Sequence, residues 1–317
     1  MENDPAQPLL FEPIFQERVW GGRSLERTFG KALPLGKNIG ESWEIVDRAE
    51  AQSIVRQGPW RGRSLHEIWC AQHDEVFGRE VVHTPRFPIL AKLLDARAKL
   101  SVQVHPPARV AAALGGEPKT EMWFVADAEP GAEVFAGLRA GATKEKFVRA
   151  LEENGISDLL HRLEVKREDA ILIPSGRLHA IGAGNLIVEI QENSDTTYRV
   201  FDWNRPGDDG QPRKLHLEEA MQSIDFADFE PELVRPEGET LLQTHEFSVE
   251  RWELDAPRPA LTQAAAAIFC CLEGALEMSG VALRAGDFFL VPASAGAGAL
   301  RPGRSGAKVL RVALPTR

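Results

Sequence analysis

The sequence predicts a mainly β protein with two barrels and a few peripheral helices, and three observations lead to this fold class. Short apolar runs alternate with Gly, Pro, Asp and Asn, a pattern typical of sandwiches and barrels. Helical periodicity is confined to a few short segments. The chain has 317 residues, more than one hydrophobic core usually serves, so two packed units are expected.

The expected strands are short and bounded by turn residues. In chain order they cover residues 100–105, 122–126, 170–174, 186–191 and 288–292. Within the first of them, apolar side chains alternate with Ser101, Gln103 and His105. Successive strand side chains point to opposite faces, so these three polar side chains share one face.

The expected helices cover residues 64–77, 108–114, 143–155 and 217–224. The segment 143–155 has the clearest pattern, with Thr143 suited as an N-cap and Gly155 as a stop. Phe147, Val148 and Leu151 would form its apolar face.

A weak internal repeat refines the fold. Residues 165–176 and 283–294 each contain an acidic turn, a four-residue apolar strand and a proline. This unit recurs in the cupin type of double-stranded β-helix, a jelly-roll barrel. Two copies predict a metal-binding catalytic domain with short helical segments over 1–240 and a metal-free domain over 241–317. Only the first copy is followed by a histidine, His179, so only the first barrel is expected to hold a metal.

Composition limits the classes of partner. With 47 acidic and 37 basic residues the net charge is −10, which argues against nucleic-acid and membrane surfaces and requires any phosphate site to be made locally. The three cysteines form no C-x-x-C pair, which favours a reducing compartment. No secretion signal and no apolar run long enough to cross a bilayer is apparent, so we expect a cytoplasmic protein.

Four polar residues are candidates for a metal site. In a barrel, distant strands meet at the mouth and bring together Gln103, His105, Glu121 and His179. Nitrogen and oxygen ligands without thiolate suit zinc, and also iron, manganese or nickel. The remaining histidines are expected to be ordinary surface or hydrogen-bonded residues: His66, His73, His83, His161, His216 and His245.

Five motifs in the same order resemble type I phosphomannose isomerases. They lie at residues 40–44 (GESWE), 87–106 (FPILAKLLDA to KLSVQVHP), 119–123 (KTEMW), 173–182 (IPSGRLHAIG) and 191–205 (QENSDTTYRVFDWNR). The resemblance implies an enzyme that interconverts mannose 6-phosphate and fructose 6-phosphate, a small sugar phosphate being its partner. It also implies one Zn²⁺ per chain, held by the four candidate ligands.

The resemblance implies roles for five further residues. It assigns Arg199 and Glu189 to catalysis, and Ser101, Lys119 and Arg205 to substrate binding. Two plainer readings stay open from the residues alone: Arg199 as a partner in a surface salt bridge, and Glu189 as a buried carboxylate that orients a neighbour.

Two other functions also stay open. One is a sugar- or metal-binding cupin module without catalysis. The other is an iron-dependent cupin dioxygenase, although Gln103 stands where such enzymes carry the first histidine of His-x-His. The sequence does not indicate the oligomeric state.

Overall fold

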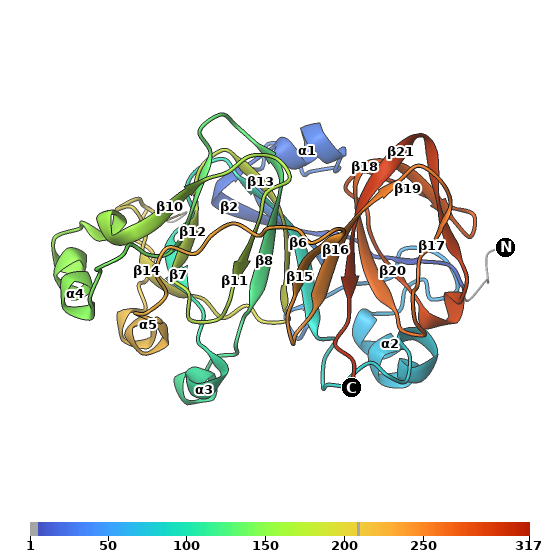
Figure 1. The fold of residues 1–317 in the computed structure, drawn as a ribbon, viewed down its shortest axis with the longest axis horizontal. Coiled ribbons are helices and arrows are strands. Elements are labelled where there is room, and N and C mark those ends of the chain that lie inside the picture. The colour runs from blue at the N-terminus through green and yellow to red at the C-terminus, as the bar shows by residue number, and fades with distance from the viewer. Residues whose placement is uncertain (1–5, 208–209) are drawn as a thin grey trace.

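The computed structural model describes residues 6–207 and 210–317, and it is mainly β (Figure 1). The start of the segment considered for a secretion signal, residues 1–5, lies outside the described residues. The five expected strands and the four expected helices are all present, which confirms the predicted fold class.

Three large sheets make up the fold. The five-stranded sheet runs β10 (Leu160–Glu164), β9 (Glu133–Leu138), β12 (His179–Ile181), β7 (Val102–Val104), β14 (Tyr198–Phe201). The six-stranded sheet runs β11 (Ala170–Ile173), β8 (Glu121–Ala128), β13 (Asn185–Glu192), β6 (Ile89–Ala96), β3 (Ile39–Ile45), β2 (Ile14–Gly22). The eight-stranded sheet runs β1 (Leu9–Leu10), β20 (Phe288–Val291), β18 (Ala267–Met278), β21 (Ala299–Ala313), β16 (Ser248–Leu254), β15 (Thr240–Gln243), with β17 (Arg258–Pro259) beside β21 and β19 (Val281–Arg284) beside β18. A small hairpin joins β4 (Asp47–Arg48) to β5 (Ala51–Gln52).

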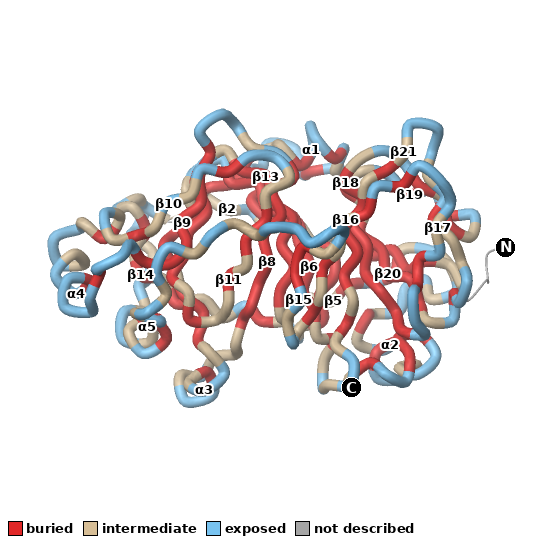
Figure 2. The backbone as a smooth tube through the Cα atoms, viewed as in Figure 1, coloured by how far each residue is buried: buried red, intermediate tan, exposed pale blue. Residues whose placement is uncertain are grey.

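The six-stranded sheet is the middle layer of the molecule. Ile187 on one face shares a core cluster with Val134 and Ile181 of the five-stranded sheet. The next residue, Val188, shares another cluster with Leu310 of the eight-stranded sheet. All eight residues of β6 are therefore buried (Figure 2). Burial on both faces explains why this strand is apolar almost throughout rather than alternating.

The helices lie at the periphery, as expected. They are α1 (Ser24–Phe29), α2 (Leu65–Ala71) with a π-helical turn at His73–Phe77, α3 (Ala108–Ala111) with a 3₁₀ turn at Ala112–Leu114, α4 (Lys144–Glu152) and α5 (Leu217–Ser223), with further 3₁₀ turns at Ile156–Leu159 and Ala293–Ala295. Thr143 caps α4 by accepting a hydrogen bond from the Lys146 amide. The predicted apolar face is wrong in one respect, because Val148 is 41% exposed while Phe147 is fully buried.

Both ends of the chain cross between the expected domains. β1 pairs with β20, with Leu9 opposite Leu290, and Thr316 forms a bridge with Val81. The division into residues 1–240 and 241–317 stays a prediction. Within residues 6–207 and 210–317, no helix has the length and apolar character needed to cross a bilayer.

The close approach of Gly78 to the C-terminal sheet generates a stability prediction. Gly78 has φ +97° and a Cβ there would lie 2.3 Å from the Ala264 carbonyl oxygen, whereas Gly62 has φ +81° and open space. Gly62→Ala should cost about 1 kcal/mol of unfolding free energy from backbone strain alone. Gly78→Ala should cost at least about 2 kcal/mol more, because backbone atoms must also move apart. Chemical denaturation of both variants measures the difference, and equal losses would contradict the steric argument.

Candidate active site

His105, Glu121 and His179 converge between the five-stranded and six-stranded sheets. His179 opens β12, Glu121 opens β8, and His105 directly follows β7. Each residue offers one ligand atom, and these atoms all lie within 4.8 Å of one another. Glu121 Oε2 is 3.5 Å from His105 Nε2, and Glu121 Oε1 is 3.5 Å from His179 Nε2. Ligand atoms in a tetrahedral zinc site with bonds of about 2.0–2.1 Å are about 3.3 Å apart, so the two distances from the carboxylate to the imidazoles fit such an ion.

Backbone carbonyls orient both imidazoles. His105 Nδ1 lies 2.7 Å from the Thr196 carbonyl oxygen, and His179 Nδ1 lies 2.8 Å from that of Arg177. A carbonyl can only accept, so each Nδ1 carries the hydrogen and each Nε2 presents a lone pair toward Glu121. His179 Nε2 is buried and has no hydrogen-bond partner among the described residues. A buried lone pair without a donor is what a metal ligand looks like before the ion is bound.

The protonation states suit metal binding. Burial, together with the charge of His105, lowers the pKa of His179 to about 3. Burial and the charge of Lys119 lower the pKa of His105. Burial would raise the pKa of Glu121, but Lys119 and His105 hold it well below its usual range. The cluster therefore offers two neutral imidazoles and a carboxylate at neutral pH, the forms that coordinate a divalent cation.

Lys119 places a buried ammonium beside this cluster. Its Nζ lies 2.8 Å from Glu121 Oε2, 3.4 Å from His105 Nε2 and 3.6 Å from Glu189 Oε1. Three N–H donors in this position can reach an oxygen of a ligand bound between the two carboxylates.

A second pair of buried charges lies on the same face of the six-stranded sheet. Glu189 is directly opposite Lys92 in the β13–β6 register, and Lys92 Nζ is 3.0 Å from Glu189 Oε1. Burial and the charge of Glu121 raise the pKa of Glu189 despite this ammonium. Sequence reasoning missed Lys92, although a lysine inside an otherwise apolar strand is itself a signal.

Glu41 extends this row of charges to β3. It accepts a hydrogen bond of 2.6 Å from Trp43 Nε1 and pairs with Arg18 at 3.0 Å. Burial would raise its pKa, but Lys92 and Arg18 lower it to about 2. Glu41 belongs to the motif at residues 40–44, but the sequence did not predict a role for it.

One cavity of about 420 Å³ is lined by Lys119, Glu189, Lys92 and Glu41, whereas His105, Glu121 and His179 do not line it. Of the residues predicted to touch substrate or metal, those that line it are Ser101, Gln103, Lys119, Glu189 and Arg199. Six charged residues that were not predicted as site residues also line it: Glu17, Arg18, Glu41, Lys92, Asp195 and Arg213. Arg205 does not line this cavity, and its guanidinium instead binds the Asp202 carboxylate at 2.8 Å.

Strand register positions Arg199 and Gln103. Gln103 is opposite His179 on one side and Arg199 on the other. Arg199 Nε lies 3.3 Å from Ser101 Oγ, and the guanidinium forms no ion pair within residues 6–207 and 210–317. The salt bridges with Asp195 or Asp202 that a plain surface role would require are therefore not observed.

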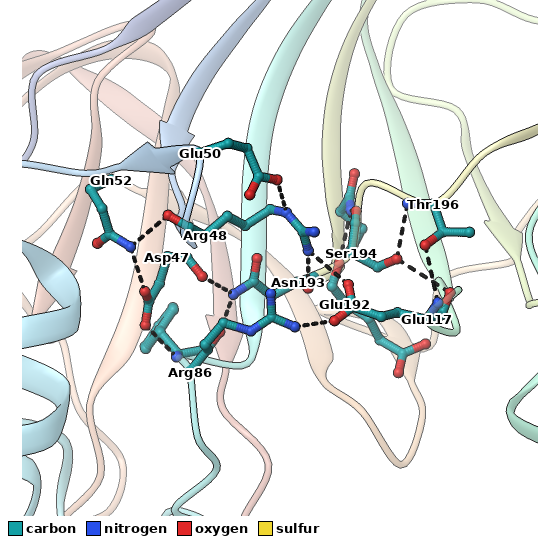
Figure 3. A network of polar contacts seen from close by, with 12 residues as sticks. Asp47, Arg48, Glu50, Gln52, Arg86, Glu117, Glu192, Asn193, Ser194 and Thr196 are labelled. Carbon is teal, nitrogen blue, oxygen red and sulfur yellow. Dashed lines mark hydrogen bonds and ion pairs between the residues drawn. The ribbon is translucent and has the colours of Figure 1, made fainter. Parts of the chain in front are cut away.

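A polar network outside the cavity supports the His105 carbonyl partner (Figure 3). Glu117 binds Arg86 and, at 2.9 Å, Arg48, and its backbone amide donates to Thr196 Oγ1 at 3.0 Å. The same Thr196 supplies the carbonyl that fixes the His105 ring. The loop after β13 is thus tied both to the metal cluster and to the β4–β5 hairpin.

Comparisons with known proteins show which sequences and structures this chain is similar to. The family model of the phosphomannose isomerase type I catalytic domain matches residues 9–120. The probable mannose-6-phosphate isomerase GmuF of Bacillus subtilis is 41% identical over 258 residues, 78% of this chain and 80% of that protein. Mannose-6-phosphate isomerase ManA of the same organism is 37% identical over 304 residues, 90% of this chain and 93% of that protein. A crystal structure of mannose 6-phosphate isomerase from Bacillus subtilis superimposes with a TM-score of 0.86 at 31% identity, covering 97% of this chain and 99% of that one.

The cluster of His105, Glu121 and His179 predicts which substitution causes loss of the metal. His179→Gln should reduce the bound divalent metal at least tenfold, because it removes the imidazole nitrogen of the cluster that has no hydrogen-bond partner among the described residues. His245→Ala is the matched control, since His245 lies in the C-terminal region and belongs to no described metal group. Elemental analysis of both purified variants measures the effect. Retained metal in His179→Gln, or lost metal in His245→Ala, would contradict the assignment.

The outer network predicts a longer-range effect on the same site. Glu117→Ala should weaken metal binding by roughly tenfold, because it loosens the carbonyl that orients His105. Glu50→Ala is the control, since the exposed Glu50 binds the same Arg48 and has no described hydrogen bond or ion pair with the loop. Competition with a chelator measures both dissociation constants. Equal constants for the two variants would show that Glu117 does not position the histidine.

Proposed function

The chain belongs to the type I phosphomannose isomerase family, and from this premise we propose that it interconverts mannose 6-phosphate and fructose 6-phosphate. One observation of the structure supports the proposal most directly. The cluster of His105, Glu121 and His179 adjoins a cavity lined by buried lysines, buried glutamates and arginines, and one of these lysines, Lys119, lies 2.8 Å from Glu121 Oε2. Such a cavity suits a small anionic substrate that must be polarised and deprotonated.

The metal of this proposal is one Zn²⁺ per chain. Two imidazole nitrogens and a carboxylate are donors that zinc favours, and Gln103, which lines the cavity opposite His179, is the proposed fourth ligand. When bound, the ion would supply Lewis-acid polarisation of the substrate carbonyl.

The chain's own residues move the proton. The reaction takes a proton from C2 of the open-chain aldose and returns one to C1. We assign this transfer to Glu189, whose raised pKa brings the carboxylate closer to the range in which a general base works well. Lys119, between Glu121 and Glu189, donates to the sugar oxygen on which negative charge develops.

The other assignments follow from the cavity. Ser101 and Arg199, 3.3 Å apart, bind the substrate on the side of the five-stranded sheet. For Arg205 a role in substrate binding stays a prediction.

The C-terminal region would bind no metal and would cover the outer face of the six-stranded sheet, which it contacts through Leu310. A cytoplasmic location stays a prediction as well.

A coupled assay of the wild-type protein with mannose 6-phosphate tests the activity. Turnover that disappears with a chelator and returns with zinc supports the proposal. Absence of turnover in a zinc-loaded preparation would favour a binding module without catalysis. Oxygen consumption in an iron-loaded preparation would favour the dioxygenase alternative.

Substitution of Arg199 distinguishes a catalytic role of this residue from simple substrate binding. If its guanidinium stabilises charge that develops during enolisation, Arg199→Ala should lower kcat by about 10²-fold while the metal stays bound. Arg199→Lys keeps the charge but loses the planar fork, so it should recover only part of the rate. Steady-state kinetics with metal analysis measures both. A raised KM at nearly constant kcat would mean that Arg199 binds ground state and transition state equally.

A further inference from the structure

A cysteine, a histidine and an aspartate meet at α2, apart from the cavity described above. His66 and Cys70 are four residues apart on this helix, so their side chains share one of its faces. Cys70 Sγ lies 3.6 Å from His66 Nε2, and His66 Nδ1 lies 3.1 Å from Asp47 Oδ2. None of the three residues lines the cavity beside the metal cluster.

Asp47 fixes the tautomer of the His66 ring. Its carboxylate is fully buried, and Oδ2 also accepts a hydrogen bond of 2.8 Å from the Phe87 amide. Oδ1 accepts a hydrogen bond of 2.8 Å from Gln52 Nε2 (Figure 3). An ionised carboxylate can only accept, so His66 Nδ1 carries the hydrogen. His66 Nε2 therefore presents a lone pair to the Cys70 thiol.

The order Cys70, His66, Asp47 is that of a nucleophile, a base and a group that orients the base. In such an arrangement the imidazole accepts the thiol proton and leaves a thiolate, which is the form of cysteine that attacks an electrophile. Cys70 is exposed, so a reagent in solution can reach its sulfur.

The other two cysteines provide an internal contrast. Cys270 and Cys271 are buried, and their Sγ atoms contact only backbone carbonyl oxygens in the described hydrogen bonds. Burial raises the pKa of Cys270 well above its usual range and the pKa of Cys271 to about 12. Cys70 is thus the thiol of this chain that combines access with a neighbouring base.

We propose that Cys70 is a modification site, at which the thiol exchanges with a low-molecular-weight disulfide and His66 acts as the base. The proposal goes beyond the proposed function, because it requires neither the metal nor a sugar phosphate. Disulfide exchange needs only a nucleophile and access to it, whereas acyl transfer would also need donors for an oxyanion.

The exchange conserves atoms and electrons. Cys70 Sγ attacks one sulfur of the disulfide, the S–S bond of the reagent breaks, and a new S–S bond forms on Cys70. The Cys70 sulfur is oxidised and the departing sulfur is reduced. The proton passes from Cys70 through His66 Nε2 to the departing thiolate. An excess of free thiol reverses the step.

Reaction of the folded protein with oxidised glutathione, followed by mass spectrometry, tests the proposal. The wild type should form a mixed disulfide at Cys70 at least about tenfold faster than His66→Ala, because the variant lacks the base. Alanine suits a helix interior, so α2 should keep its structure. Imidazole in the buffer should restore part of the rate in His66→Ala and should not raise that of the wild type.

A displaced thiol is the matched control for exposure. The double variant Cys70→Ser, Ala71→Cys moves the thiol by one exposed position on α2, where Glu67 instead of His66 lies four residues before it. It should react at least about tenfold more slowly than the wild type. Cys270 and Cys271 should stay unmodified in every variant, and their protection reports that the protein is folded.

Two results would overturn the proposal. One is an equal rate in the wild type and in folded His66→Ala, and the other is an equal rate in the wild type and in the displaced thiol. Either result would show that Cys70 reacts as any exposed thiol does, without the help of His66.

Discussion

The six-stranded sheet is covered on both faces, by the five-stranded sheet on one side and by the C-terminal sheet on the other. A charged side chain in the middle of this sheet is therefore withdrawn from water, and an unpaired charge there would cost several kcal/mol. The site follows from this constraint. Lys92, Glu189, Lys119 and Glu121 alternate in sign, with contacts of 3.0, 3.6 and 2.8 Å between neighbours. Each charge is tolerated because its neighbours on the sheet neutralise it.

Such a row of charges is rigid, and rigidity suits a reaction in which charge must develop at a fixed place. Lys92, Glu189 and Glu121 sit on paired strands, so their spacing is set by backbone register, and Lys119 lies two residues before β8. Dipoles and charges that are already oriented need not reorganise when the substrate reacts. The two histidines are held in the same way, by carbonyls of Thr196 and Arg177 that fix their tautomers.

The sequence was sufficient for the parts of the site that lie on one strand or in one motif. The alternation in residues 100–105 predicted a polar face, and the repeat before His179 predicted which barrel carries the metal cluster. The structure places His105, Glu121 and His179 together.

What the sequence could not supply are contacts made by residues outside any periodic segment. Arg213 follows no strand and no motif, so nothing marked it as facing the cavity. The place of Lys92 and Glu41 in the site depends on which face of the sheet is turned toward the other charges, and the sequence does not indicate that face. The pairing of β1 with β20 is a long-range contact without a local signal.

That pairing has a consequence for biosynthesis. Leu9 and Leu10 leave the ribosome long before their partners, Leu290 and Phe289. All the sheets between these two segments must be made before this strand can be paired. Contacts between segments so far apart form slowly, because a long loop must be closed before the contact gains any free energy. During translation an apolar N-terminal segment therefore waits without its sheet, which makes the nascent chain a natural client for chaperones that shield exposed strands.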